Sequence, residues 1–368
     1  MSEVVCLGEL IVDMISSTRD ASIEASESFF PTPGGAPANV AVGLVRQGVS
    51  ASYIGKVGED AFGRLMFNTM LSQGVDASGI AFDAEARTTL NFNARRADGV
   101  RECLFYRNPG ADMRLSPDDI REELFRDALV FHFGSVTLSS GNGCAATDRA
   151  LEYAKENGLL ISYDPNLRLG LWNAPEEEIR ETIASYFDKA DFVKISDDES
   201  EFILGTSDPR EIAKKLVARG VKLVAVTMGS KGCFWSDGTR EGRIDAFNDG
   251  IFMVDTTGAG DSFVASMVAH LAARKRRASP SPPTTNMPPP AISPTARALW
   301  PPPGSARSPR FPPGRKSLPP TKNKIRRRKN RRALLSEARA FCLSFDATGS
   351  PNRRKVPGRK GQKGSRLR

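Results

Sequence analysis

Asp255-Thr-Thr-Gly-Ala-Gly-Asp-Ser-Phe263 is the stretch on which the interpretation of this chain depends. It follows an apolar run and leads into an apolar helical pattern that ends at Leu271. Gly258 and Gly260 allow successive backbone N–H groups to turn toward one point, where a helix N-terminus adds positive potential. This combination predicts an anion-binding turn. Asp261 lies inside it, and a carboxylate there is suited to take a proton from a hydroxyl that attacks a phosphate.

Charge divides the chain into two parts. The 368 residues suffice for one large α/β domain or two ordinary ones, and the net charge is +9. Residues 273–368 contain 26 of the 52 basic residues, two acidic residues and 17 of the 25 prolines. Residues 1–272 therefore carry a net charge of −15. The composition predicts an acidic globular body followed by a basic, proline-rich tail.

Cysteine and histidine usage argues against several classes of site. The five cysteines are scattered without a Cys-x-x-Cys pair, which favours a reducing compartment over a disulfide framework or a zinc site. His132 and His270 lie in apolar surroundings and are interpreted as structural. No apolar run approaches the roughly 20 residues of a membrane span, and the N-terminus shows no presequence pattern. We therefore expect a cytoplasmic protein without a membrane segment.

Two stretches near the N-terminus are predicted to face a ligand. Val4–Leu10 is a short apolar run, interpreted as a buried strand, and Asp13 follows it. Open α/β sheets bind ligands beyond the carboxyl ends of their strands, so Asp13 is either a sugar-binding carboxylate or an ordinary turn residue. Gly34 and Gly35 permit close backbone approach to a ligand, and Asn39 projects from the first turn of the helix that follows.

The βα alternation is interrupted between residues 79 and 108. Thr89–Ala94 and Arg101–Tyr106 flank Asp98-Gly99, a strong hairpin signal. This hairpin predicts a small β lid, built from elements within about 12–35 and 79–108. Its polar side chains either contact a substrate or form a solvated strand face; they are Asn91, Asn93, Arg107 and Asn108.

Strands and helices alternate again after residue 128. Strands are predicted at 129–133, 159–163, 191–195 and 222–227, and helices at 143–157, 176–189 and 209–219. The strand 159–163 ends in Asp164-Pro-Asn-Leu-Arg168, which places polar side chains on the same side as Asp13. Arg168 is suited to a phosphoryl oxygen or a sugar hydroxyl.

Two further turns point to a nucleotide and a cation. The acids of Ser196-Asp-Asp-Glu-Ser-Glu201 either cap a helix or hold Mg²⁺ through water. The glycine-rich turn Met228-Gly-Ser-Lys-Gly232 can lie against a nucleotide, although this signal is weak alone. After Leu271 the apolar period stops, and residues 273–368 are predicted to be disordered.

These residues together resemble the ribokinase-like, pfkB-type carbohydrate kinases, and within that family the plant fructokinases. The match spans about residues 3–271. The two family signatures correspond to Gly34-Gly-Ala-Pro-Ala-Asn-Val-Ala-Val-Gly43 and to Asp255–Phe263. The other similar stretches are Gly55–Asp60, Phe105–Pro109, Tyr163–Arg168 and Val226–Cys233.

The resemblance implies a three-layer α/β/α sandwich with a β-sheet lid, and ATP-dependent phosphorylation of D-fructose to fructose 6-phosphate with Mg²⁺. It also assigns roles to individual residues. Asp261 is the implied general base, and Gly258, Ala259 and Gly260 are the implied anion hole. The implied sugar-binding residues are Asp13, Gly34, Gly35, Asn39, Asn93, Arg107 and Arg168. The implied nucleotide-side residues are Lys194, Thr227, Gly229 and Gly232, with Glu199 for Mg²⁺ through water and Asp255 and Thr257 for a monovalent cation such as K⁺.

Two departures from the family pattern stand out. Ser196 replaces the amide of the family's Asn-x-x-Glu sequence, while Glu199 matches it. Family members also continue past the second signature with helices that complete the adenine pocket, where this chain has its basic segment. The kinase domain, 1–272, is therefore interpreted as incomplete at its C-terminal end. The tail, 273–368, is either a genuine nucleic-acid-binding arm or the translation of intron or shifted-frame sequence.

Three functions remain open at this point. The first is an active fructokinase that binds sugar and ATP and pairs as a homodimer through the lid; a ribose-like sugar is the less favoured substrate. The second is an inactive, truncated kinase-like protein. The third is a non-catalytic protein that binds nucleic acid through its tail, against which the intact Asp261 and its glycines argue.

Overall fold

A nine-stranded sheet forms the body of the protein in the computed structural model, which describes residues 2–98, 100–246 and 258–278. Its strand order is β13-β12-β11-β10-β9-β8-β1-β4-β5. The strands from β11 to β5 pair in parallel, whereas β12 and β13 pair antiparallel at one edge. Their bounds are β1 Val4–Leu7, β4 Ala51–Gly58, β5 Asp76–Asp83, β8 Val130–Gly134, β9 Leu160–Asp164, β10 Phe192–Ser196, β11 Leu223–Thr227, β12 Cys233–Ser236 and β13 Glu241–Ile244.

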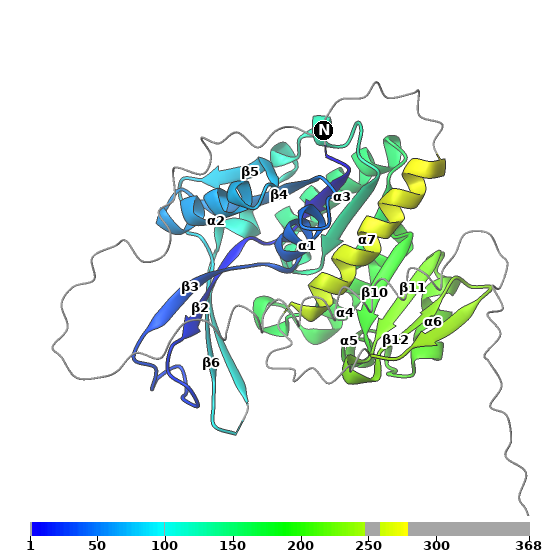
Figure 1. The fold of residues 1–368 in the computed structure, drawn as a ribbon. Coiled ribbons are helices and arrows are strands. Elements are labelled where there is room, and N and C mark those ends of the chain that lie inside the picture. The colour runs from blue at the N-terminus through cyan, green and yellow to red at the C-terminus, as the bar shows by residue number, and fades with distance from the viewer. Residues whose placement is uncertain (1, 99, 247–257, 279–368) are drawn as a thin grey trace, which may run out of the picture.

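Helices cover both faces of this sheet (Figure 1). One face carries α1 (Ala36–Val45), α2 (Ala61–Ser72) and α7 (Ala259–Ala278). The other carries α3 (Gly141–Glu156), α4 (Glu176–Ser185), α5 (Asp197–Leu204) and α6 (Pro209–Ala218). Short 3₁₀ turns occur at Ala111–Arg114, Pro117–Asp119, Glu122–Leu124, Val136–Ser139, Leu169–Leu171, Phe187–Lys189 and Gly229–Lys231.

The alternation of side chains along β1 explains the layers. Val5 and Leu7 pack with the core of one face, while Val4 and Cys6 pack with the core of the other. All four are fully buried. A strand whose two sides are both covered reads as a continuous apolar run, as parallel sheets do. The predicted three-layer α/β/α sandwich is confirmed.

A second, four-stranded sheet extends from the body as a lid (Figure 1). Its strand order is β3-β2-β6-β7, with bounds β2 Ile11–Ser16, β3 Phe29–Gly34, β6 Leu90–Arg95 and β7 Arg101–Tyr106. The hairpin predicted at Asp98-Gly99 is confirmed as β6 and β7. The run predicted as one strand from Val4 to Leu10 is wrong beyond Leu7, because the chain leaves the body sheet there and enters the lid as β2.

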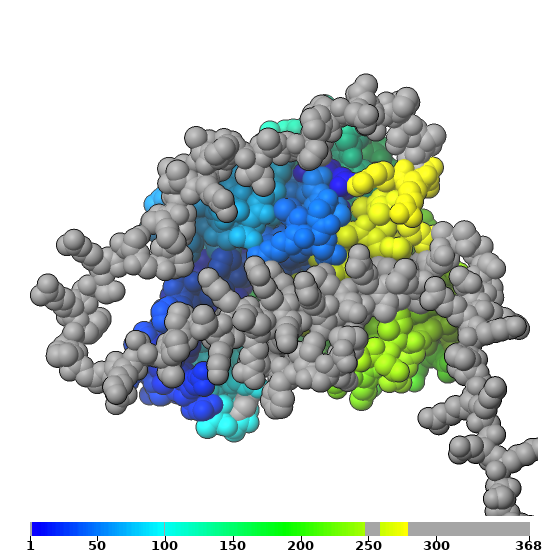
Figure 2. All heavy atoms as spheres, in the orientation of Figure 1, coloured from blue at the N-terminus to red at the C-terminus, as the bar shows by residue number. Residues whose placement is uncertain are grey.

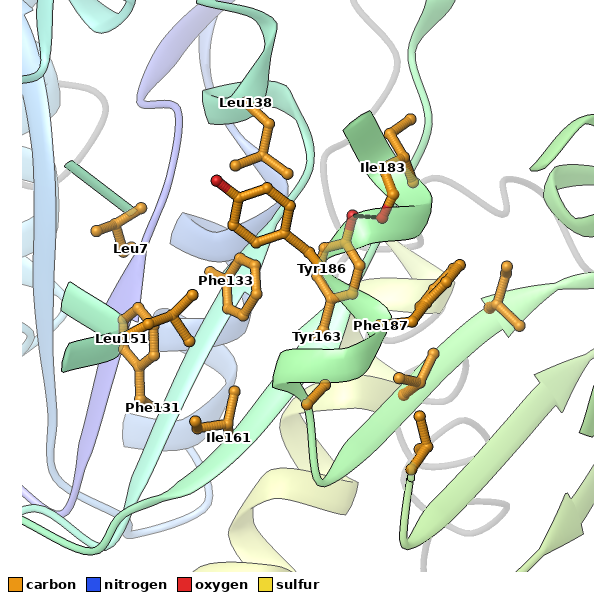
Figure 3. Close-up of a cluster of buried hydrophobic side chains, with 14 of the residues drawn as sticks. Leu7, Phe131, Phe133, Leu138, Leu151, Ile161, Tyr163, Ile183, Tyr186 and Phe187 are labelled. Carbon is orange, nitrogen blue, oxygen red and sulfur yellow. Dashed lines mark hydrogen bonds between the residues drawn. The ribbon is translucent and has the colours of Figure 1, made fainter. Parts of the chain in front are cut away.

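Stacked aromatic rings fill the core beneath the centre of the sheet (Figure 3). The rings of Phe133 and Tyr163 are stacked with centroids 4.6 Å apart. The Tyr163 hydroxyl donates a hydrogen bond of 3.3 Å to the carbonyl oxygen of Ile183 in α4. Because these rings stand on β8 and β9, they fix the two strands whose carboxyl ends lead into the Asp164 turn.

Helix α7 extends further than the sequence pattern predicts. The apolar period stops at Leu271, yet the helix continues to Ala278. Lys275 Nζ donates 3.0 Å to the carbonyl oxygen of Leu129, and Arg276 pairs with Glu3. Basic side chains also favour the last turn of a helix, where the backbone dipole is negative. The prediction that disorder begins at residue 273 is therefore wrong for 273–278, and residues 279–368 lie outside the described part.

Helix α7 packs directly on α1, and Figure 2 shows their atoms side by side. A Cβ atom at Gly43 would lie 2.8 Å from the Cβ of Ala265, so this approach requires a glycine in α1. The contact joins the two signature segments of the chain. Among the described residues, no helix is both long and apolar enough to cross a membrane.

Candidate active site

Asp261 is held by two amides that come from distant parts of the chain. It lies in the first turn of α7, three residues after Gly258, whose φ of 77° is left-handed. Asn39 Nδ2, from the first turn of α1, donates a hydrogen bond of 2.8 Å to Oδ2 of Asp261. Asn166 Nδ2, from the loop after β9, donates 3.3 Å to Oδ1. Three segments therefore converge on one buried carboxylate, and each oxygen has an amide partner.

The environment of Asp261 makes it a better base. Burial raises the pKa of its carboxyl group, while the hydrogen bond from Asn39 and the charges of Lys194 and Arg168 act in the opposite direction. A raised pKa strengthens a carboxylate as a proton acceptor, and the two amides hold it ionised and oriented. This balance suits general-base chemistry at a hydroxyl group.

Lys194 supplies a positive charge next to the turn that was predicted to bind an anion. Its ammonium lies 3.2 Å from Oδ1 of Asp164 and is almost fully buried. Burial opposes this charge, but Asp164 and Glu199 raise the pKa of Lys194, so the group is cationic. A Cβ atom at Gly260 would lie 3.5 Å from Nζ. The buried ammonium therefore lies close to the backbone of the turn.

Glu199 caps α5 and braces the loop that carries Arg168. Its Oε2 accepts from the Ser196 backbone N–H at 3.0 Å and from the Ser196 hydroxyl at 2.8 Å. Its Oε1 accepts from the Leu167 N–H at 2.6 Å. Burial opposes ionisation, but Lys194 and these donors lower the pKa of Glu199. The helix-capping interpretation of the acidic stretch is confirmed.

The described residues of this site form no cluster of metal ligands. In the part of the chain that the structure describes, no group of three or more His, Cys, Asp or Glu side chains is arranged to hold a metal ion. The donors that occupy both oxygens of Glu199 fit contact with a cation through water better than direct ligation. Asp255 and Thr257, predicted to hold a monovalent cation, lie outside the described residues.

Asp13 stands at the mouth of the lid, next to the glycine turn. Asn91 Nδ2 and Asn93 Nδ2 donate to its Oδ1 at 2.8 and 3.1 Å. A Cβ atom at Gly34 would lie 2.5 Å from Oδ2, so the glycine turn touches the carboxylate. Burial raises the pKa of both Asp13 and Asp261, and the positive charge of Arg168 partly opposes this rise in each.

Arg107 has a different environment from the one the sequence predicts. Its Nε donates a hydrogen bond of 2.7 Å to Oδ2 of Asp112. Its Nη2 lies 2.7 Å from the same oxygen. The remaining contacts are to the Ser139 hydroxyl and to the carbonyl oxygens of Leu171 and Val136. The buried guanidinium is thus engaged at the base of the lid. These contacts make Arg107 a structural brace between the lid and the body, and its sugar-binding role stays a prediction.

The nucleotide-side candidates lie at the end of β11. The Thr227 hydroxyl is 3.5 Å from the carbonyl oxygen of Ile195, and Gly229 has a φ of 52°. Gly232 has a φ of 89°, and a Cβ atom there would lie 2.0 Å from the carbonyl oxygen of Ile244. Gly232 is therefore required by the tight return into β12. The three residues lie at the same end of the sheet as Asp164, which is the last residue of β9.

Two residues of this region were given no individual role from the sequence. Asn166 belongs to the predicted polar cluster, but its bond to Asp261 depends on a φ of 44° that turns its side chain inward. Glu9 is buried at the base of the lid, where Oε1 accepts from the Ala36 N–H at 2.7 Å. Its signal was a carboxylate within an apolar run. The structural interpretation of His132 agrees with its environment, since burial lowers its pKa to about 3.

The pfkB family carbohydrate kinase model matches residues 1–279 of this chain. The chain belongs to the pfkB family of carbohydrate kinases. The probable fructokinase-2 of Arabidopsis thaliana is 45% identical over 266 residues, which are 72% of this chain and 80% of that protein. About a fifth of that relative therefore lies outside the match.

Solved structures show the same fold. A fructokinase from Xylella fastidiosa with bound ATP has a TM-score of 0.66 and 29% identity, covering 74% of this chain and 83% of that one. A double mutant of a Vibrio cholerae O395 fructokinase, in a form with fructose, ADP and potassium ion bound, has a TM-score of 0.66 and 32% identity, covering 74% and 84%. The fold is that of a ribokinase-like sugar kinase, and the family transfers a phosphoryl group to a carbohydrate.

Proposed function

We propose that this protein phosphorylates D-fructose to fructose 6-phosphate with ATP as the donor. The observation that carries the proposal is the Asp261 carboxylate, held by Asn39 and Asn166 at the N-terminus of α7. Its surroundings suit deprotonation of a hydroxyl next to a site for phosphate. Fructose is favoured over ribose because fructokinases are prominent among the relatives and the solved structures.

The proposed reaction is a direct transfer. The 6-hydroxyl gives its proton to Asp261 while its oxygen forms a bond to the γ-phosphorus of ATP. The bond from that phosphorus to the bridging oxygen breaks, and ADP leaves with the electron pair. The backbone N–H groups of Gly258, Ala259 and Gly260, with the Lys194 ammonium behind them, stabilise the charge on the transferring group. Asp261 then releases its proton to solvent.

The sugar is proposed to lie between the lid and the body. Asp13, on the lid, accepts hydrogen bonds from sugar hydroxyl groups, and Gly34 and Gly35 allow the sugar to approach the backbone. Asn39 bonds Asp261 and borders the same space. Arg168 is exposed and acts electrostatically on Asp13 and Asp261, so it is placed to contact a sugar or phosphoryl oxygen.

ATP is proposed to lie along the end of β11, next to Thr227, Gly229 and Gly232. Mg²⁺ fits near Glu199 through bridging waters, and when bound it neutralises charge on the phosphate oxygens. K⁺ is proposed at Asp255 and Thr257. We further propose a cytoplasmic location and a homodimer that forms through the lid.

Coupled measurement of ADP release with the full chain tests the proposed substrate. Fructose should be phosphorylated with a higher kcat/KM than ribose or adenosine. Asp261→Asn should lower kcat by about 10²–10⁴-fold, since it removes the base, while fructose affinity changes little. Asp118→Asn, at an exposed aspartate outside the site, is the matched control and should retain activity. A higher kcat/KM with ribose or adenosine would refute fructose as the substrate.

A catalytically silent chain is the competing outcome. It is motivated by the fifth of the plant relative that this chain does not match. Calorimetric titration with fructose separates the two cases, because the proposed sugar-binding residues Asp13 and Asn39 both precede the segment that differs from the relatives. Fructose binding without ADP release would favour the inactive alternative over the enzyme.

A further inference from the structure

The lid presents an organised polar face around Asp13. Strands β2 and β6 pair in parallel with Asp13 opposite Asn91 and Ile15 opposite Asn93. Side chains of paired residues lie on the same side of a sheet, so both amides flank the one carboxylate. Asn91 and Asn93 are both more than nine-tenths buried. Burying the polar side-chain amide of an asparagine costs free energy of desolvation. The presence of two such amides side by side on the lid therefore suggests a specific role.

The two amides bond only one of the two carboxylate oxygens of Asp13. Both Asn91 Nδ2 and Asn93 Nδ2 donate to Oδ1, at 2.8 and 3.1 Å. A carboxylate oxygen has two lone-pair sites, so Oδ1 is saturated. Within the described residues, no hydrogen bond reaches Oδ2, the oxygen that faces Gly34. The open oxygen thus points to the glycine turn.

Asn93 is itself held in the orientation that donates to Asp13. Its Nδ2 also donates 2.9 Å to the carbonyl oxygen of Asn91. The Cys103 thiol, from β7, lies 3.1 Å from its Oδ1. With both ends of its amide engaged, Asn93 is placed to act on Asp13 rather than on a sugar directly. This revises the role that the family resemblance implies for Asn93.

We propose that Asn91 and Asn93 are positioning residues, which we call the amide pair, and that they fix Asp13 so that only Oδ2 accepts sugar hydroxyls. This inference rests on the proposed sugar-binding role of Asp13. The amide pair replaces solvent around a partly buried carboxylate and removes its rotation. A carboxylate that is already oriented loses less entropy when a sugar binds.

The charges around Asp13 define a pH test. Burial raises the pKa of Asp13, whereas Asn91, Asn93 and the charges of Arg101 and Arg168 lower it. The Cys103 thiol is the other titratable group close by. Because amide N–H groups bond the ionised form, removing them should raise the pKa of Asp13 and shift fructose affinity toward higher pH.

The test uses the full chain with Asn91→Leu, Asn93→Leu and the double variant, with Asn68→Leu on exposed α2 as the control. Calorimetry should show fructose binding weakened by about 10–100-fold at pH 7 in the double variant, the loss expected for hydrogen bonds to a charged group. The control should bind as the wild type does. At saturating fructose, kcat should stay within about threefold, since Asp261 is unchanged.

Asp13→Asn combined with the double variant decides whether the amide pair acts through Asp13. If it does, adding Asp13→Asn to the double variant weakens binding far less than it weakens the wild type. If Asp13→Asn instead weakens fructose binding by the same factor in the double variant as in the wild type, the amides bind the sugar themselves. That result would overturn the proposal.

Carboxyl ¹³C NMR titration supplies a readout that needs no sugar. The pKa of Asp13 should rise in the double variant and stay the same in Asn68→Leu. An unchanged Asp13 pKa in the double variant would refute the amide pair even if fructose binds. A wild-type chain that fails to bind fructose would instead refute the proposed function, while the NMR titration still decides the proposal.

Discussion

Single residues at the base of the lid carry buried charge. Glu9 lies where the chain leaves β1 for β2, and its carboxylate accepts from the first N–H of α1. Its carbonyl oxygen accepts 2.7 Å from the Tyr53 hydroxyl. A Cβ atom at Gly35 would lie 2.2 Å from the same carbonyl oxygen, and Gly35 has a φ of 111°. Glu9 therefore connects two crossings between body and lid.

The pKa of Glu9 leads to a prediction about stability. Burial raises this pKa to about 7 from 4.5, partly opposed by the Ala36 N–H and by Arg107. Because the folded state favours the protonated form of Glu9, its contribution to the free energy of unfolding is fully present below pH 4.5. That contribution is lost as the pH rises through 7. Glu9→Gln should therefore be more stable than the wild type at pH 8, by on the order of 3 kcal/mol, and similar to it at pH 4.5.

Urea denaturation at pH 4.5 and pH 8 measures this difference in the free energy of unfolding. Glu59→Gln is the matched control, because Glu59 is exposed and should show no such pH-dependent gain. A constant difference between Glu9→Gln and the wild type at both pH values would contradict a buried, titrating Glu9.

At the scale of elements, the lid is a sheet whose two faces differ in chemistry. One face carries Asp13, Asn91 and Asn93, while the other carries an aromatic cluster. In that cluster, the ring centroid of Phe92 lies 5.0 Å from that of Phe29 and 5.4 Å from that of Tyr106. This alternation places polar groups toward the proposed sugar site and apolar groups on the opposite face.

The outer face of the lid predicts the oligomeric state. Leu104 is 45% exposed and Tyr106 is 62% exposed, both on β7, an edge strand of the lid. Leu104→Glu with Tyr106→Glu should convert the proposed homodimer to a monomer, because charges on that face would be buried or repel across the interface. Sedimentation velocity measures the change. Leu71→Glu, at a 50% exposed leucine of α2, should leave a dimer intact, and a wild-type monomer would contradict the lid interface.

The whole molecule combines two regions of opposite charge. Residues 1–278 carry a net charge of −11, while residues 279–368 carry +20. The full chain should therefore bind duplex DNA at low salt and release it as salt rises, because Lys and Arg displace counterions from phosphates. A chain ending at residue 278 should not bind, since its net charge repels DNA.

Fluorescence anisotropy with labelled duplex at several salt concentrations measures this binding. The truncated chain is compared at the same protein concentration and should keep the fold described above, because α7 ends at Ala278. Equal DNA binding by the two chains would place the interaction in the body and contradict a role for the basic segment.

Local patterns predicted much of the architecture. The alternation of strands and helices after residue 128 follows from hydrophobic period, which depends on neighbours in sequence. The acidic stretch Ser196–Glu201 was expected to cap a helix as one alternative, and Ser196 and Glu199 form a capping box at the start of α5. Some bounds were wrong: the helix predicted over 176–189 ends at Ser185 and is followed by a separate 3₁₀ turn.

The sequence by itself determined the family, the layered fold and the position of Asp261, because these depend on signature residues and on periods of two and 3.6. Only the tertiary structure decided the partners of each carboxylate. Asn166 reaches Asp261 across 95 positions, and Asn91 reaches Asp13 across 78. Such pairs depend on strand register and side-chain direction, which no local period encodes. The same reason explains why Arg107 became a brace and why α7 extends to Ala278, where its last turn contacts Leu129 and Glu3.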